Sequence, residues 1–236
     1  MLTRAPPEMR AWARVWSWLR IHRLRLVVLF AFVLAPLLVF GLLAEDVLEN
    51  ESFFFDRAIL LYLHGHSSAD LDRLMLFFSR IGSGFWITLV DLLVLFYLAA
   101  RRRRGDAFFW GLAVGGAASL NYAAKYSFAR ARPDFWLSIA PEKTFSFPSA
   151  HAMQTMALVT AVLVLVWPTK MRWPALVVGS AFVLLVGLSR VYLGVHYPSD
   201  VIAGWAASLA WVIGLSVVLY GYAAKIAPQA EPASLA

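Results

Sequence analysis

The chain has 236 residues, of which 61% are hydrophobic and only 15% carry a charge. Soluble domains contain about 45–50% apolar and about 25% charged residues, so this composition excludes a water-soluble globule and indicates a membrane protein. The absence of cysteine excludes disulfides and thiolate metal sites. The formal net charge of +7 favours anionic lipid headgroups, not nucleic acid, as the partner of the basic clusters.

Six segments are apolar enough to be transmembrane helices, each of which needs about 20 mostly apolar residues. They are residues 26–44, 81–100, 107–122, 150–167, 175–188 and 201–220. The first follows basic residues, as a signal peptide would, but its apolar run is too long and Leu42-Leu43-Ala44 is not a cleavage site. The predicted fold is all-α, a polytopic membrane helical bundle of residues 26–222 with six transmembrane helices and short interfacial helices.

Three other segments are expected to lie outside the bilayer core. Residues 1–25 form a basic amphipathic tail, in which Trp12, Trp16 and Leu19 make a stripe typical of a helix lying on the membrane surface. The stretch 53–78 mixes apolar residues with Asp and Arg and predicts a second interfacial segment. Residues 223–236 form a short tail, and its end from Pro228 is expected to be disordered.

The distribution of positive charge predicts the orientation. Lys and Arg gather in the N-terminal tail, at Arg101–Arg104, around Lys170 and at Lys225. With six spans these groups all fall on one side, which the positive-inside rule makes cytoplasmic. We therefore expect an inner-membrane protein with both termini in the cytoplasm. The loop between the third and fourth spans breaks the rule, because it puts Lys125, Arg130, Arg132 and Lys143 outside.

Polar residues gather at three outward-facing places, and the first is the end of the third span. Seven residues make about two helical turns, so Lys125 and Arg132 are expected on one helical face about 10 Å apart. Pro133 is expected to end this helix. Arg130 is expected to point elsewhere, towards solvent or headgroups.

The other two clusters lie at the starts of the fourth and sixth spans. Ser149 is a common type of helix N-cap, and the free N–H groups there make an anion site close to His151. In the run from Ser189 to Asp200, the carboxylate of Asp200 follows His196 by four residues. It can hold one imidazole nitrogen and leave the other free to attack.

Each of these residues alone has a purely structural explanation. Lys125 can extend from a helix end to the interface, and His151 can be an interfacial histidine with satisfied hydrogen bonds. Arg190 can flank a helix, and Ser149 can be a cap. Together, however, the clusters supply three cations, two histidines, one carboxylate and a helix N-terminus, which phosphoryl transfer through a covalent histidine requires.

The pattern K-x6-RP, then PS-x-H, then SR-x5-H-x3-D, between Lys125 and Asp200, resembles the type 2 phosphatidic acid phosphatase (PAP2) superfamily. The resemblance implies that His196 is the nucleophile, that Asp200 orients it, and that His151 is the general acid and then the base. It also implies a phosphate-binding group of Lys125, Arg132, Arg190 and Ser149, with Ser189 as a helper. Ala150 stands where the family usually has Gly, and we expect it to affect the rate, not the reaction type.

The implied activity is hydrolysis of a lipid phosphomonoester or diphosphate on the outer face, with undecaprenyl diphosphate, phosphatidic acid or phosphatidylglycerophosphate as substrate. No metal or other cofactor is expected, because the outer loops lack a convincing ligand pattern and the cations supply the electrostatics. The alternatives are a lipid phosphotransferase and a non-enzymatic phospholipid-binding or transport protein. The vanadate-dependent haloperoxidases share the motifs but are soluble.

Two further expectations concern residues outside the motifs. Asp91 lies within the second span. We interpret it as a structural residue that forms a hydrogen bond with Asn121. Four aromatic residues surround the site, and interfacial anchoring is favoured over guidance of lipid chains. They are Phe135, Trp136, Phe145 and Phe147.

Overall fold

The computed structural model describes residues 26, 27, 29–49 and 53–226, and all regular secondary structure in them is helical. The helices are η1 (Phe30–Leu34, a π-helical turn), α2 (Ala35–Leu48), α3 (Phe54–Gly65), α4 (Ala69–Ile81), α5 (Gly84–Ala100), α6 (Arg104–Phe128), α7 (Ala150–Val166), α8 (Arg172–Tyr192) and α9 (Pro198–Ile226). The predicted stripe of Trp12, Trp16 and Leu19 and the predicted disordered end from Pro228 lie outside the described residues.

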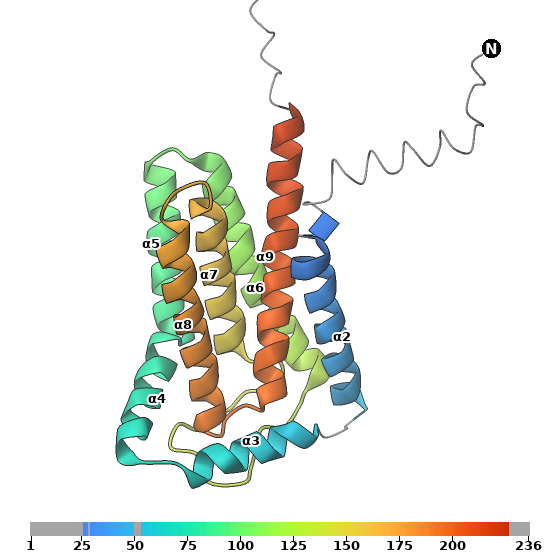
Figure 1. The fold of residues 1–236 in the computed structure, drawn as a ribbon, viewed down its shortest axis with the longest axis vertical. Helices are drawn as coiled ribbons and strands as arrows, with labels where there is room; N and C mark the ends of the chain where they lie inside the picture. Colours follow the sequence, from blue (N-terminus) through green and yellow to red (C-terminus); the bar gives the residue numbers. More distant parts are fainter. Residues whose placement is uncertain (1–25, 28, 50–52, 227–236) are drawn as a thin grey trace, which may run out of the picture.

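Helices α2 and α5–α9 run along one common direction as a bundle, and α3 lies across one end of it (Figure 1). Helix α7 is central, because it packs against α5, α6, α8 and α9. Its contacts are made largely by small side chains, and the core cluster includes Ala157 and Ala161 of α7 with Ala113 and Ala117 of α6. Small residues let helices approach closely where lipid removes the usual hydrophobic driving force.

Each of the six predicted spans coincides for most of its length with helix in the bundle, although the span 81–100 starts at the end of α4 and the span 26–44 includes η1 as well as α2. Among the described residues, three helical stretches are long and apolar enough to cross a bilayer by themselves: Phe30–Leu48, Arg172–Tyr192 and Pro198–Gly221. The pair α4 and α5, bent by 43°, makes a fourth if it counts as one span. The all-helical membrane fold is therefore confirmed, and the number of six spans stays a prediction.

The predicted interfacial stretch 53–78 forms two helices instead of one. Helix α3 exposes Phe54 and Tyr62 at the end of the bundle, and α4 then turns back along it (Figure 1). The break is marked by Ser68, whose side chain accepts a hydrogen bond from the N–H of Leu71 and so caps α4.

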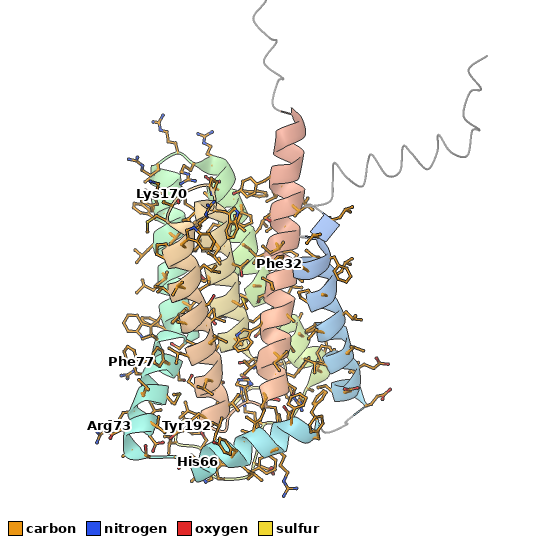
Figure 2. The ribbon with its side chains drawn as sticks, viewed as in Figure 1. Phe32, His66, Arg73, Phe77, Lys170 and Tyr192 are labelled. Carbon is orange, nitrogen blue, oxygen red and sulfur yellow. The ribbon has the colours of Figure 1, made fainter. Side chains whose placement is uncertain are left out.

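The two ends of the bundle differ. Figure 2 shows Lys170, in the α7–α8 loop, at the end opposite to His66, Arg73 and Tyr192. The α5–α6 loop with Arg101–Arg104 lies at the Lys170 end, away from α3 (Figure 1). The basic loops and the helix that lies across the bundle therefore occupy opposite ends.

The expected hydrogen bond between Asp91 and Asn121 is wrong. Asn121 donates to the carbonyl oxygen of Pro148 and to the sulfur of Met153, whereas Asp91 Oδ1 has no hydrogen-bond partner among the described residues. The indole N–H of Trp110 donates to the backbone oxygen of Asp91, so Asp91 lies beside that turn of α6. Trp110 and Asn121 are separated by roughly 16 Å along the helix axis, which puts Asn121 out of reach.

The reading of all four aromatics as interfacial anchors is wrong for Phe147. Its side chain is fully buried and stacks on Phe40, with ring centroids 5.9 Å apart, while Phe128 meets it edge-on at 5.0 Å. These rings close the space between α2 and the end of α6. Phe147 therefore anchors the loop that leads into α7 instead of reaching the lipid.

Helix α9 approaches the start of α7 at Gly204. A Cβ atom at this position would lie 2.9 Å from the carbonyl oxygen of Ser149 and 3.2 Å from Cβ of Ala152. We expect Gly204→Ala to force the two helices apart and to lower the free energy of unfolding by about 1–3 kcal/mol. The measurement is the midpoint of thermal unfolding in detergent. Gly111→Ala is the matched control, because nothing lies within 4 Å of that position, and equal midpoints for the two variants would contradict the close packing.

Candidate active site

The three sequence clusters meet at the end of the bundle that carries α3. Lys125 comes from the last turn of α6, Arg190 from the last turn of α8, and His151 from the first turn of α7. His196 and Asp200 lie at the α8–α9 junction. The loop 129–149 joins α6 to α7 and contributes Arg132 and Ser149. All seven predicted site residues thus come from consecutive helix ends on one side.

His196 is held in a defined tautomer. Its side chain is fully buried, and Nδ1 lies 3.3 Å from Oδ2 of Asp200. Its Nε2 lies 3.1 Å from Nη1 of Arg132. Because a guanidinium can only donate, Nε2 must carry the lone pair and Nδ1 the proton. The nitrogen with the lone pair therefore faces Arg132.

The surroundings also set the charge of this imidazole. Burial, followed by the positive charges of Arg132 and Arg190, lowers the pKa of His196 well below its ordinary value. The ring is therefore neutral near pH 7, which is the state that a nucleophile needs.

Lys125 and Arg132 converge, but not in the way the helical spacing predicted. Helix α6 ends at Phe128, and Ala129 takes the left-handed conformation (φ 46°) at its C-terminus, so Pro133 does not end the helix. Arg132 lies in the following loop. Its Nη2 donates to Oγ1 of Thr144 at 3.1 Å, and Nζ of Lys125 donates to the same oxygen at 3.3 Å. A chain reversal, and not a shared helical face, brings the two cations together.

Glu142 lies among these cations, and sequence reasoning missed it. One of its oxygens accepts a hydrogen bond from Nη2 of Arg132 at 2.9 Å, and the other accepts one from Nη2 of Arg190. The second oxygen also lies 3.9 Å from Nδ1 of His151. Burial alone would raise the pKa of Glu142, but the positive charges around it, that of Arg190 first and then that of Arg132, hold the pKa below its usual range, so the carboxylate is ionised. The available signal was an acid, one of two with Asp134, inside an otherwise basic outward loop.

Ser149 occupies the N-cap position of α7 but does not cap it with its side chain. The hydroxyl is fully buried and has no hydrogen-bond partner among the described residues. The same holds for Nε of Arg190, whose side chain is only 2% exposed. Buried polar atoms normally have partners, so these two open positions fit a bound anion. Ser189 behaves differently, since its hydroxyl donates to the carbonyl oxygen of Val186 within α8 at 2.6 Å.

The expectation that Arg130 points to solvent or headgroups is wrong. Its side chain is 13% exposed, and Nη1 donates to Oδ1 of Asp200 at 2.5 Å. Its Nη2 donates to Oδ2 of Asp56 at 3.0 Å. The early end of α6 redirects the chain after Phe128 and turns Arg130 inwards. No sequence spacing could have shown the partnership with Asp56, because that residue comes from α3, and three helices, α4, α5 and α6, separate it from Arg130 in the chain.

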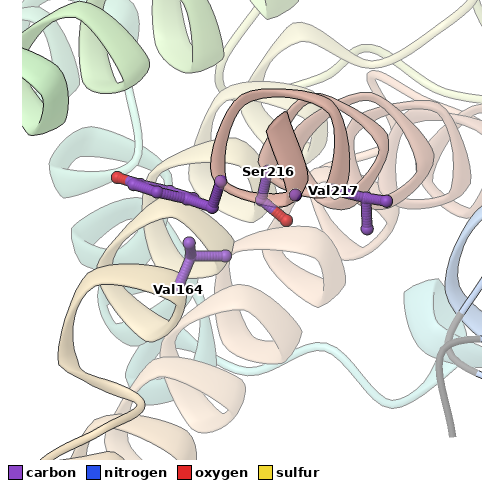
Figure 3. A pocket seen from close by; sticks show the side chains of 5 residues that line it. Val164, Ser216 and Val217 are labelled. Atoms are coloured by element: carbon purple, nitrogen blue, oxygen red, sulfur yellow. The ribbon is translucent and has the colours of Figure 1, made fainter. Parts of the chain in front are cut away.

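A pocket lies between α7 and α9 (Figure 3). Val164 of α7 and Ser216, Val217, Tyr220 and Gly221 of α9 line it. The hydroxyl of Tyr220 donates to Asp106 in the first turn of α6, which places the pocket near the opposite end of the bundle. None of the residues lining it belongs to the three clusters.

Comparison with known proteins identifies the family. The model of the PAP2 superfamily matches residues 106–223. An undecaprenyl-diphosphatase of Sulfolobus acidocaldarius is 32% identical over 174 residues, which cover 71% of this chain and 80% of the relative. Phosphatidylglycerophosphatase B of Bacillus subtilis is 30% identical over 148 residues, covering 59% of this chain and 70% of the relative.

A solved structure agrees with these sequence relatives. The crystal structure of a transmembrane PAP2-type phosphatidylglycerolphosphate phosphatase from Bacillus subtilis aligns with a TM-score of 0.70 and 25% identity. The alignment covers 83% of this chain and 98% of that one. The matched segment includes all three clusters described above. The chain therefore belongs to the PAP2 superfamily, as its motifs predicted, and is a membrane phosphatase of that family.

Proposed function

We propose that this protein removes phosphate from a lipid phosphomonoester or diphosphate through a phosphohistidine formed on His196. The observation that carries the proposal is the placement of the carboxylate of Glu142 between Arg132 and Arg190. This carboxylate marks a position that suits an anion, and Nε2 of His196 lies 3.1 Å from Nη1 of one of the two cations, Arg132. A phosphate that replaced it would meet the nucleophile directly.

The proposed reaction has two steps. Nε2 of His196 attacks phosphorus, and the bond from phosphorus to the leaving oxygen breaks as the imidazolium form of His151, which the negative charge of bound phosphate would favour, gives its proton to that oxygen. Asp200 stabilises the imidazolium that forms. In the second step His151 takes a proton from water, the water oxygen attacks phosphorus, and the N–P bond breaks to release orthophosphate.

The cations supply the electrostatic stabilisation of this reaction. Lys125, Arg132 and Arg190 surround the position of Glu142, and hydrogen bonds between a cation and phosphate oxygens are about twice as strong as neutral ones. The hydroxyl of Ser149 and Nε of Arg190 offer two more open positions for phosphate oxygens. This arrangement supports a metal-independent mechanism.

The position of the site supports a lipid substrate. It lies beside α3, which exposes Phe54 and Tyr62, so the phosphate would be met at the level of the headgroups. The basic loops at the opposite end favour a cytoplasmic location for that end and an outer, periplasmic location for the site. Named relatives act on undecaprenyl diphosphate and on phosphatidylglycerophosphate, and we place both substrates first.

The first test is release of orthophosphate from these two lipids and from phosphatidic acid, in detergent with excess chelator. We expect His196→Ala to lower turnover by at least about 1,000-fold, because it removes the nitrogen that would attack phosphorus. His66→Ala is the matched control at the same end of the molecule (Figure 2), and we expect it to retain full turnover.

Other results would contradict parts of this proposal. Wild-type turnover in His196→Ala would exclude the phosphohistidine route, and a strict requirement for added metal would exclude the metal-free mechanism. Phosphate that appears only on a second lipid would identify the protein as a transferase that uses the same residues.

The carboxylate of Glu142 generates a second test, because it competes with phosphate for Arg132 and Arg190. We expect Glu142→Gln to bind orthovanadate or orthophosphate about tenfold more tightly, as measured by inhibition. Its negative charge also raises the pKa of His196, so its loss should move the acid limb of kcat/KM to lower pH. Asp134→Asn, an exposed acid in the same loop, is the control. Unchanged inhibition and an unchanged acid limb would show that Glu142 does not occupy the phosphate position.

A further inference from the structure

Asp56 connects the helix across the end of the bundle to the helix that carries Asp200. It lies in the first turn of α3 and is only 3% exposed. Its Oδ1 accepts the backbone N–H of Ser199 at 2.8 Å, and its Oδ2 accepts the hydroxyl of Ser199 at 2.5 Å. Ser199 belongs to the first turn of α9, where N–H groups lack partners within the helix. Asp56, which belongs to α3, therefore caps α9 at Ser199, the residue directly before Asp200.

Arg130 extends this connection to the proposed catalytic pair. Its two terminal nitrogens bridge Asp56 and Asp200, at 3.0 and 2.5 Å. The guanidinium lies over the ring of Tyr197, 4.1 Å from its centroid, which limits its movement. The charges then alternate along the chain of contacts: Asp56 negative, Arg130 positive, Asp200 negative and the imidazolium of His196 positive.

This alternation matters for the support that Asp200 gives to His196. Arg130 by itself would draw the charge of Asp200 away from the imidazole, because both cations compete for one carboxylate. Asp56 balances the charge of Arg130 from its other side. Asp200 then keeps its negative charge available when His196 becomes positive in the phosphohistidine.

We infer that Asp56 and Arg130 are positioning residues for the nucleophile: they fix Asp200 at the start of α9 and keep its charge available for His196. This inference rests on the proposed role of His196. Neither residue is among the three motifs, and neither has a hydrogen bond to Lys125, Arg132 or Arg190. They should therefore affect kcat and leave phosphate binding intact.

The test compares Asp56→Asn, Arg130→Met and the double variant in detergent, with the best lipid phosphate as substrate. We expect each single variant to lower kcat about 10–100-fold with KM changed by less than about twofold. The double variant removes both charges and leaves Asp200 and His196 as a balanced pair. We therefore expect it to be more active than Arg130→Met alone. A role in packing alone would make the two losses add.

The matched control is Asp70→Asn. Asp70 also pairs with an arginine on a short helix at this end, Arg73, but both side chains are largely exposed. It should keep the wild-type kcat. If Asp56→Asn does not fold, Arg130→Lys replaces it, because one ammonium cannot bridge both carboxylates in the way a guanidinium does. That variant should lose kcat about tenfold at constant KM.

The inference would be overturned if kcat stayed at the wild-type value in Asp56→Asn or in Arg130→Lys. Additive losses of kcat in the double variant would overturn it as well. The His196→Ala variant separates this failure from failure of the proposed function. If His196→Ala is inactive while Asp56→Asn is fully active, only the positioning role is wrong. If His196→Ala is itself active, the phosphohistidine proposal is wrong.

Discussion

The burial of several cations at one end of an apolar bundle is the constraint on which the rest of this site depends. A buried charge without a partner costs several kcal/mol, and here Arg190 is almost inaccessible to solvent. The protein meets this cost with Glu142 and with the backbone carbonyl oxygens of the loop 129–149, such as that of Thr144, which Arg132 contacts at 2.6 Å. A site satisfied in this way is already shaped for an anion before any substrate arrives.

The same constraint explains the shape of the loop between α6 and α7. If α6 continued to Pro133, the helix would use the backbone carbonyl oxygens of this segment in its own hydrogen bonds. It would also carry Arg132 away from Val195 and His196. The left-handed residue Ala129 ends the helix early and lets the chain fold back over the site. Phe147, buried between rings of α2 and α6, then fixes where the chain enters α7. Local backbone conformation and aromatic packing together decide where the cations lie.

The helix across the end of the bundle has a role that its composition alone did not suggest. Its exposed aromatic side chains suit the membrane surface, as expected for the stretch 53–78. Its one buried acid, Asp56, faces inward to the start of α9. Helix α3 is thus both an interfacial helix and a support for the proposed nucleophile.

Sequence alone determined the class of this protein and most of its proposed site. Apolar length predicted helices at all six expected places, and the three motifs identified the residues that the fold gathers, because helix ends on one side of a bundle must meet. The tertiary structure decided what depends on chain direction and long-range pairing. It turned Arg130 inward, placed Glu142 among the cations, paired Asp56 with Ser199 and left Asp91 apart from Asn121. Periodicity reports which residues share a face of one helix, whereas these contacts join segments that no local pattern connects.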